Sequence, residues 1–235
     1  MKIRGVVSTL LAGALLLSTS VPSTASEVAM PSEDIANIRS ELSAVGIESE
    51  IQDQLISKLE NGIPWDSLNG ISSPVSKTTE HLSSETVERE VYADGSVAIT
   101  RTEKGIETPS SSGMQARKIS GCLKLTTKSG WARWGDCKSK VNLVIVQMSF
   151  NFDYSLKKGK QARIDRIFNH SNFCTCIVDR DSTKVTRKYS DGAAPATARA
   201  SVRYTIGPWK GVGAVSDGWS QVNIDKNGKL WTTHN

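Results

Sequence analysis

The chain of 235 residues has little of what most enzyme active sites are built from. It has three histidines and no glutamate after Glu107, and it lacks a G-x-S-x-G segment, a Walker phosphate loop and the dinucleotide-binding glycine pattern. The acidic residues after residue 110 are all aspartates, and their spacing singles out no pair for acid–base catalysis of the glycosidase kind. We therefore expect no catalytic residues, no enzymatic activity and no cofactor.

Long hydrophobic runs are also missing after the first 25 residues. At the N-terminus, Lys2 and Arg4 precede the apolar run 6–21, and a proline and small residues follow it. A positive start, a hydrophobic middle and a small-residue exit are typical of a secretory signal, with cleavage expected near Ala25. We expect residues 1–25 to be a signal peptide and the mature protein to be secreted (extracellular), without a transmembrane span. A retained N-terminal anchor is the alternative.

Only four cysteines occur, and all of them lie in the second half. Thiols of an exported protein tend to oxidise to disulfides. Cys122 and Cys137 flank a turn-forming Ser-Gly pair, which favours a bridge between them across adjacent strands and leaves Cys174 with Cys176. A bridge across one residue is geometrically tight, and the crossed pairings stay open. Together with His170, the last two cysteines supply three ligands, fewer than a structural zinc site uses, so we expect no metal.

Charge is distributed unevenly along the chain, although the net charge is only +5. Residues 26–110 carry 16 acidic and 6 basic side chains, a net charge of −10, whereas residues 111–235 carry 8 acidic and 21 basic side chains, a net charge of +13. The boundary is rich in Gly, Ser, Thr and Pro, as exposed linkers are, and we place the linker at 111–118. Arg117 and Lys118 at its end suit a trypsin-like protease, and an uncut tether is the alternative.

The acidic segment, residues 26–110, is predicted to contain two short helices and a β-hairpin. Apolar residues recur at spacings of three and four within 32–62, with a glycine after each stretch. Residues 86–103 alternate around Asp94–Gly95, a dipeptide suited to a two-residue turn. A helical pair of about 30 residues is too small to be stable alone. It therefore needs a partner surface, either the basic domain or another protein.

The segment SEIQDQLISKLENGIPWDSLNG, followed by PVS, YADGS and ISGC, resembles a pattern in uncharacterised secreted proteins of Gram-positive bacteria, particularly actinobacteria. The similarity covers roughly residues 45–140. In those proteins the pattern precedes a small β-rich domain, and the family has no assigned activity. The resemblance therefore implies export and a helical hairpin before a β-rich domain, and it implies no particular function.

From residue 119 onward the sequence predicts short strands. Six apolar or aromatic residues from Val144 to Tyr154 alternate with polar ones, the run 199–206 repeats the pattern, and Asn227–Gly228 separates two further alternating runs. We expect a mainly β protein in which residues 119–235 form a basic antiparallel β-sandwich of seven or eight strands. The helical hairpin and the β-hairpin precede this sandwich.

Lysines and arginines of the basic domain cluster near tryptophans, which indicates a surface for anionic partners. Tryptophan beside cations suits the headgroup region of an anionic membrane, and it also suits stacking on the sugar rings of cell-wall polymers. Nucleic acid would attract the same charge, but a secreted protein meets it less often. The predicted surface-binding residues are Trp131, Arg133, Trp134, Lys157, Lys158, Lys160, Trp209 and Lys210.

The charge division suggests a masking hypothesis. The acidic segment contacts the basic domain within the chain and holds it inactive, and the domain freed by cutting or displacement binds anionic cell-envelope polymers or lipids, as a bacteriocin-like antimicrobial protein does. We keep three alternatives: a non-catalytic binding or structural module, a protease inhibitor that presents the loop 124–136, and an extracellular nuclease.

Overall fold

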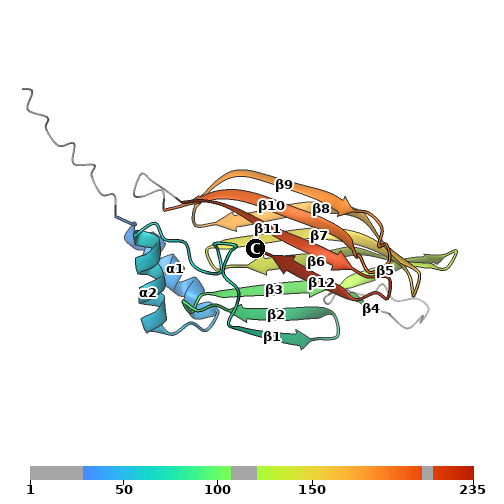
Figure 1. Cartoon of the computed structure of the whole chain (residues 1–235), viewed down its shortest axis with the longest axis horizontal. Coiled ribbons are helices and arrows are strands. Elements are labelled where there is room, and N and C mark those ends of the chain that lie inside the picture. Colours follow the sequence, from blue (N-terminus) through green and yellow to red (C-terminus); the bar gives the residue numbers. More distant parts are fainter. Residues whose placement is uncertain (1–28, 107–120, 208–213) are drawn as a thin grey trace, which may run out of the picture.

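The computed structural model describes residues 29–106, 121–207 and 214–235, and only the backbone of residues 106 and 123–126. Two helices come first, α1 (Ser32–Ala44) and α2 (Ser49–Glu60), and strands follow (Figure 1). The predicted signal peptide at 1–25 and linker at 111–118 lie outside the described residues. The strands are β1 (Ser76–His81), β2 (Glu85–Val91), β3 (Val97–Glu103), β4 (Gly105–Ile106), β5 (Cys122–Lys128), β6 (Trp131–Asn142), β7 (Val146–Lys157), β8 (Gln161–Cys174), β9 (Ile177–Arg187), β10 (Ala196–Ile206), β11 (Ala214–Ile224) and β12 (Leu230–His234).

The strands form two packed sheets. The larger sheet has eight strands in the order β1-β2-β3-β6-β5-β4, with β7 paired to β6 and β8 paired to β7. The smaller sheet has four strands in the order β12-β11-β10-β9. The strand pairs are antiparallel except for β4 with β5. The predicted fold class, a mainly β protein with an antiparallel sandwich and a short helical unit before it, is confirmed.

Strand alternation places one part of the core between the two sheets. Along β10 every second residue from Ala196 to Ile206 is buried, and along β7 Val146, Met148 and the aromatic residues face inward. Phe150, Phe152 and Tyr154 of β7 share a cluster with three alanines of β10, so large side chains of one sheet lie against small ones of the other. Large side chains opposite small ones allow the two sheets to pack closely.

The helical pair packs on the second part of the core, at the end of the sandwich away from the cluster of aromatic residues and alanines. Ile38 of α1 and Leu55 and Leu59 of α2 are buried in one cluster with Leu143 and Met148 of the basic half. This surface of the basic half is the partner that the small helical pair needs to be stable. Figure 1 shows both helices at one end of an elongated molecule.

Trp65, in the segment after α2, anchors the acidic segment to this core. Its side chain is fully buried, and its indole Nε1 donates a hydrogen bond to Leu55 O at 2.7 Å. Further along, Leu68 O accepts hydrogen bonds from Tyr204 Oη at 3.3 Å and from Ser216 Oγ at 3.2 Å, so this segment also contacts the smaller sheet.

The acidic β-hairpin is part of the larger sheet. Strand β3 pairs with β6 over four residue pairs, from Ile99 opposite Asn142 to Thr102 opposite Ser139. Thr102 also contacts Thr232 of β12, with 2.5 Å between their hydroxyl oxygens. In the described residues, the acidic and basic segments therefore share one sheet and one core.

The two predicted tight turns are each one residue longer than expected. Val91 pairs with Val97, and Gly95 N donates to Tyr92 O at 3.0 Å, so the turn has three residues with Gly95 last. The same hydrogen bond runs from Gly228 N to Asp225 O at 3.1 Å. Each glycine has a positive φ, of 81° and 90°, which fits a type I turn followed by a left-handed residue rather than a two-residue turn.

Candidate functional site

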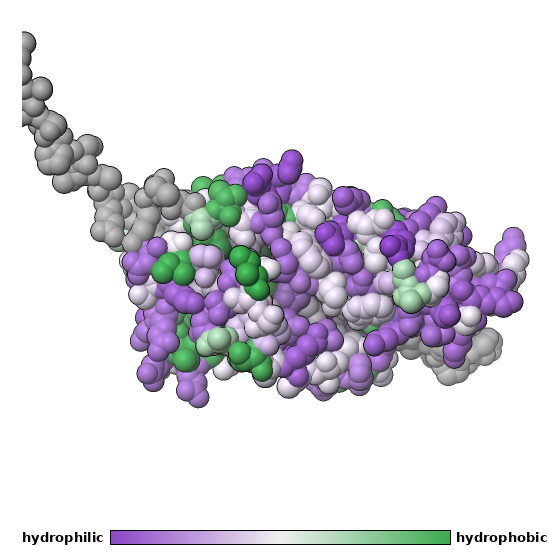
Figure 2. All heavy atoms as spheres, in the orientation of Figure 1, coloured by the Kyte–Doolittle hydropathy of each residue, from purple (hydrophilic) through white to green (hydrophobic). Residues whose placement is uncertain are grey.

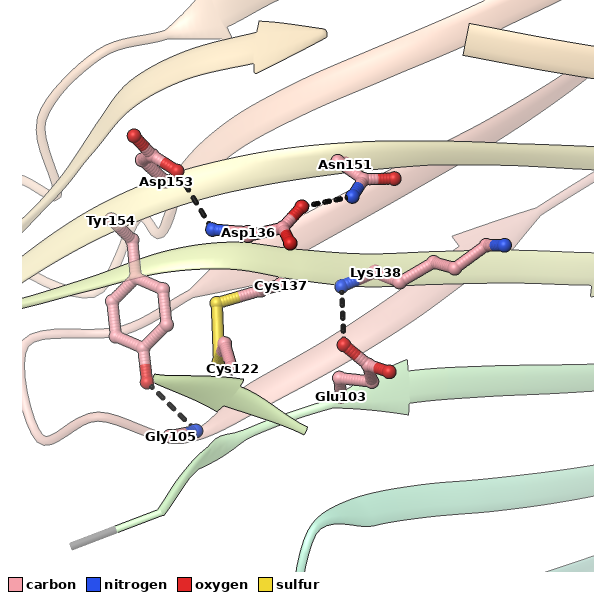
Figure 3. The surroundings of a disulfide bond; sticks show 9 residues. All are labelled: Glu103, Gly105, Cys122, Asp136, Cys137, Lys138, Asn151, Asp153 and Tyr154. Atoms are coloured by element: carbon pink, nitrogen blue, oxygen red, sulfur yellow. Dashed lines mark hydrogen bonds between the residues drawn. A yellow bond between two sulfur atoms is a disulfide. The ribbon is translucent and has the colours of Figure 1, made fainter. Parts of the chain in front are cut away.

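The structure joins the four cysteines in two disulfides. Cys122 of β5 and Cys137 of β6 are bridged with 4.2 Å between their Cα atoms, and both residues are buried (Figure 3). Cys174 and Cys176 are bridged at the turn between β8 and β9. Among the described residues, no group of three histidine, cysteine or acidic side chains is placed to hold a metal ion.

Figure 3 shows that the acidic segment reaches the first of these disulfides. Gly105 N donates to Tyr154 Oη at 3.3 Å, and Glu103 Oε2 accepts a hydrogen bond from Lys138 N at 3.0 Å. Burial raises the pKa of the Tyr154 hydroxyl to about 12, so it stays protonated at neutral pH. The end of the acidic segment is therefore held on the basic half at the disulfide.

Trp134 does not belong to the predicted binding surface. Its side chain is only 6% exposed, and its ring stacks on Tyr154 with 5.0 Å between ring centroids. A Cβ on residue 105 would lie 2.1 Å from the Trp134 indole nitrogen, so only glycine fits there without displacing the ring. Trp134 is a core residue.

Arg133 takes part in an ion-pair network around Asp153. Its Nη2 lies 3.0 Å from Asp153 Oδ2, and Arg166 Nε lies 2.7 Å from the same oxygen. The alternation of β7 places Asp153 on the face opposite Phe152, as predicted, but the carboxylate is fully buried under these arginines. Because a buried carboxylate needs such partners, Arg133 stabilises the fold, although part of its side chain is exposed.

Four of the predicted residues gather at one end of the molecule, opposite the helices. Lys157, Lys158 and Lys160 lie on the turn between β7 and β8, and Trp131 begins β6 at the neighbouring β5–β6 turn. A Cβ on Gly130 of that second turn would lie 3.6 Å from Lys157 Cε, so the two turns touch. The Trp131 ring is half-buried, with the Arg163 guanidinium carbon 5.2 Å from its centroid.

A third turn, between β11 and β12, completes this end. Gly159 N donates a hydrogen bond to Lys226 O at 2.9 Å, which joins the β7–β8 turn to the β11–β12 turn. Trp231 follows this turn, with Lys229 Nζ 5.7 Å from its ring centroid. We call the six lysines of the three turns the lysine tip: Lys128, Lys157, Lys158, Lys160, Lys226 and Lys229.

The lysines of the lysine tip form no ion pair among the described residues. None of its six ammonium groups lies within 4.0 Å of a described carboxylate, whereas most described cations elsewhere on the larger sheet are paired. The nearby Asp225 accepts hydrogen bonds from Asn227 N and Lys229 N at 2.8 and 2.9 Å, and it thereby holds the turn. The tip is thus a compact positive surface on a fixed framework.

Trp209 and Lys210 lie outside the described residues. The flanking described residues, Gly207 and Ala214, lie at the helix end, because β10 ends there and β11 begins there. Eleven-residue β11 then leads to the lysine tip. The predicted set therefore does not form one continuous site in the described structure.

The helix end has the opposite charge. Residues 32–60 carry seven acidic and two basic side chains. Figure 2 shows apolar surface residues gathered near the helices and mostly hydrophilic ones toward the far end. The exposed apolar residues between α2 and β1 are Ile63, Ile71 and Val75. The molecule is therefore electrically polar along its length.

Two histidines bind carboxylates without forming a catalytic triad in the described structure. His170 Nδ1 lies 3.3 Å from Asp181 Oδ2, while its Nε2 is buried and contacts no described hydrogen-bonding group, so no described serine hydroxyl is placed as a nucleophile. His234 Nε2 lies 3.0 Å from Glu90 Oε2, which joins the last strand to the acidic β2.

Comparison of the chain with protein-family models, with curated proteins and with solved structures found no match. Neither of the two helices in the described part of the chain is long and apolar enough to cross a membrane.

Proposed function

We propose that the protein is a secreted, non-catalytic binding protein whose lysine tip attaches it to anionic polymers or lipids of a cell envelope. The observation that carries this proposal is that three turns, far apart in the sequence, bring together six lysines that form no ion pair among the described residues. The shared chemistry of the partner is a dense array of phosphate or carboxylate groups.

Electrostatics supplies the driving force for this attachment. A lysine or arginine close to an anionic membrane contributes about 1 kcal/mol, so six lysines contribute on the order of 6 kcal/mol at low salt. The attraction falls off within a Debye length of about 10 Å at 0.1 M salt, so binding has to weaken as salt rises. Trp131 and Trp231 beside the cations suit the interfacial region of a lipid layer or the face of a sugar ring.

The framework keeps the lysines close together before any partner binds. The Cys122–Cys137 bridge joins β5 to β6, and the hydrogen bond from Gly159 N to Lys226 O joins two of the turns. Preorganisation lowers the conformational entropy lost on binding. The negative helix end lies at the other pole, so repulsion orients the molecule with its tip toward an anionic surface.

We propose that the intact mature chain binds, rather than a basic domain freed from the acidic segment. Displacing that segment would break the four β3–β6 residue pairs and expose the buried Trp65 and its neighbours to water. The acidic helices also lie away from the lysine tip, so among the described residues they do not cover it. Harm to competing bacteria, the bacteriocin-like role, is a narrower prediction that a growth-inhibition assay with the intact chain tests.

The test compares two triple variants with equal loss of charge. Residues 26–235 are incubated with vesicles of phosphatidylglycerol and phosphatidylcholine, and with isolated Gram-positive cell walls, at 20 and 300 mM salt. We expect K157Q/K158Q/K160Q to bind both anionic targets at least tenfold more weakly at low salt than the unchanged protein. The matched control K138Q/K140Q/K184Q removes three cations from outside the tip, and we expect it to lose less than threefold.

Two outcomes would contradict the proposal. One is equal loss of binding in both triple variants, because the tip would then have no special role. The other is binding that does not change between 20 and 300 mM salt, or that is equally strong on vesicles of phosphatidylcholine alone.

A further inference from the structure

A second surface, on the outer face of the smaller sheet, has the features of a ligand-binding groove. A cavity of about 440 Å³ lies across β9, β10 and β11, within the size range of small-molecule sites. Its lining includes Arg180, Ser182, Ser201, Arg203, Asp217 and Trp219. None of these residues belongs to the lysine tip.

Strand register explains why a depression forms there. Ser201 of β10 lies opposite Ser182 of β9 and Trp219 of β11, while the next outward residue, Arg203, lies opposite Arg180 and Asp217. The two small serines form a low floor, and the long side chains of the adjacent row form one wall. From β9 to β11 the floor spans roughly 10 Å, two inter-strand spacings.

Trp219 of β11 forms a second wall of the groove, and Arg199 holds its ring in place. The Arg199 guanidinium carbon lies 4.2 Å from the Trp219 ring centroid, and Arg199 Nε donates to Gln221 Oε1 at 3.0 Å. Because Arg199 is not among the residues that line the cavity, we infer that it covers the ring face that points away from the groove. The other ring face is left for a ligand.

The polar groups of the groove are available for a ligand among the described residues. Neither serine hydroxyl forms a hydrogen bond there, and Arg180 has no ion pair. Asp181 also lines the cavity, but its carboxylate is engaged by Asn172 at 2.8 Å and by His170 at 3.3 Å. The Arg203–Asp217 contact is long, at 3.6 Å, and exposed. Such exposed pairs contribute little, so a ligand carboxylate can compete for Arg203.

We propose that this groove binds one acidic sugar residue of an anionic polysaccharide, a uronic acid being the simplest example. The Arg180 and Arg203 guanidiniums suit a carboxylate, because their planar N–H forks match its two oxygens. The C–H face of the sugar ring suits the negative face of the Trp219 ring. The hydroxyls of Ser182 and Ser201 then form hydrogen bonds with the hydroxyls of the sugar. This site goes beyond attachment through the lysine tip and would name one class of envelope polymer that the protein selects.

The test uses residues 26–235 and calorimetric titration with tri-galacturonate in 0.3 M salt, where contributions from the tip are screened. We expect binding of tri-galacturonate and at least tenfold weaker binding of the uncharged galactose trimer. R180Q should weaken binding about tenfold, and S201L, which fills the floor, should abolish it. The control K184Q, an exposed change on the same strand outside the groove, should alter the affinity less than twofold.

Several outcomes would overturn the proposal. These are no binding of tri-galacturonate, equal binding of its uncharged counterpart, equal effects of R180Q and K184Q, or tighter binding of a single-stranded oligonucleotide that R180Q also weakens. Melting curves identify any variant that fails to fold, and R180Q alone then decides because its side chain is exposed. The tip variant K157Q/K158Q/K160Q should keep tri-galacturonate binding, so failure of the groove and failure of the tip are separately visible.

Discussion

At the helix end, side chains from residues far apart in the sequence are buried together; at the lysine tip, side chains from equally distant turns are brought together in water. Trp65 of the acidic segment and Leu143 of the basic half belong to the first group, and Lys157 and Lys226 belong to the second. Burial of apolar surface stabilises the first group, whereas like charges in the second repel one another. We infer from this difference that the acidic segment stabilises the fold, whereas the lysine tip is retained for binding.

The largest expected effect is on the helix end. Trp65→Ala removes a fully buried indole and its hydrogen bond to Leu55 O, and we expect the free energy of unfolding to fall by about 3–5 kcal/mol. Lys158→Ala at the tip should change it by less than about 0.5 kcal/mol, because surface substitutions rarely matter more. Urea unfolding of both variants checks this, and the milder Trp65→Phe serves if the alanine variant does not fold. Equal stabilities would show that the acidic segment is not part of the core.

The two disulfides should differ in the same direction as the lengths of their loops. Cys122 and Cys137 are 15 residues apart, so replacing both with alanine should lower the free energy of unfolding by about 3 kcal/mol on the chain-entropy model. Cys174 and Cys176 are separated by two positions, and replacing both should cost less than half as much, because the unfolded chain loses little freedom through so short a loop. Urea unfolding of the two double variants measures the difference, and the reverse order would contradict it.

Local periodicity predicted most of the fold. A two-residue alternation of apolar and polar residues does not depend on the order of strands in a sheet. Strands β7 and β10 and their buried faces could therefore be recognised from the sequence. Trp134 was wrongly expected at the surface because the phase of β6 changes nearby. The register of β6 against β7 shifts between Trp134 and Cys137, and Asp136 between them has a φ of 57°. A bulge of this kind reverses which side chains face inward, and its only local sign in the sequence is Gly135 within the strand.

The candidate sites were harder to predict because they depend on sheet order. Gly159 and Lys226 are 67 positions apart, and their backbones are hydrogen-bonded only because their turns lie at the same end of the sandwich. The groove likewise depends on the register that sets Ser201 between Ser182 and Trp219. Among the three turns of the lysine tip, the clustering of lysines in the sequence pointed only to the β7–β8 turn, and no local pattern pointed to Arg180 or Trp219 as groove residues.

A smaller effect is expected where the acidic hairpin meets the C-terminal strand. The hydrogen bond from His234 lowers the pKa of Glu90 to about 2 against the opposing effect of burial, and Lys77 adds to the lowering. A carboxyl whose folded pKa lies below its usual value of about 4.5 stabilises the fold above that pH, and the contribution disappears as pH falls toward 2. Glu90→Gln should therefore cost about 1–3 kcal/mol at pH 7 and flatten the pH dependence between 5 and 2.

Thermal melting of the Glu90→Gln variant across pH 2–7 measures this effect. The control is Glu80→Gln on β1, whose side chain is exposed and unpaired among the described residues. Its melting curves should follow those of the unchanged protein. If both variants kept the same dependence of melting temperature on pH, the contact between Glu90 and His234 would not stabilise the fold.

The smallest expected effect is that of cutting the chain between its two charged segments, and it distinguishes the masking hypothesis from a single folded body. A specific protease site placed within 111–118 allows the cut to be made after folding. All four cysteines lie beyond the cut, so no disulfide would join the pieces. They should nevertheless elute together in gel filtration, because the β3–β6 pairs and the shared core hold them. Cut and uncut protein should then bind anionic vesicles with affinities within twofold of each other. If the acidic segment were instead a removable mask, the two pieces would separate after the cut and the basic piece would bind the vesicles more strongly.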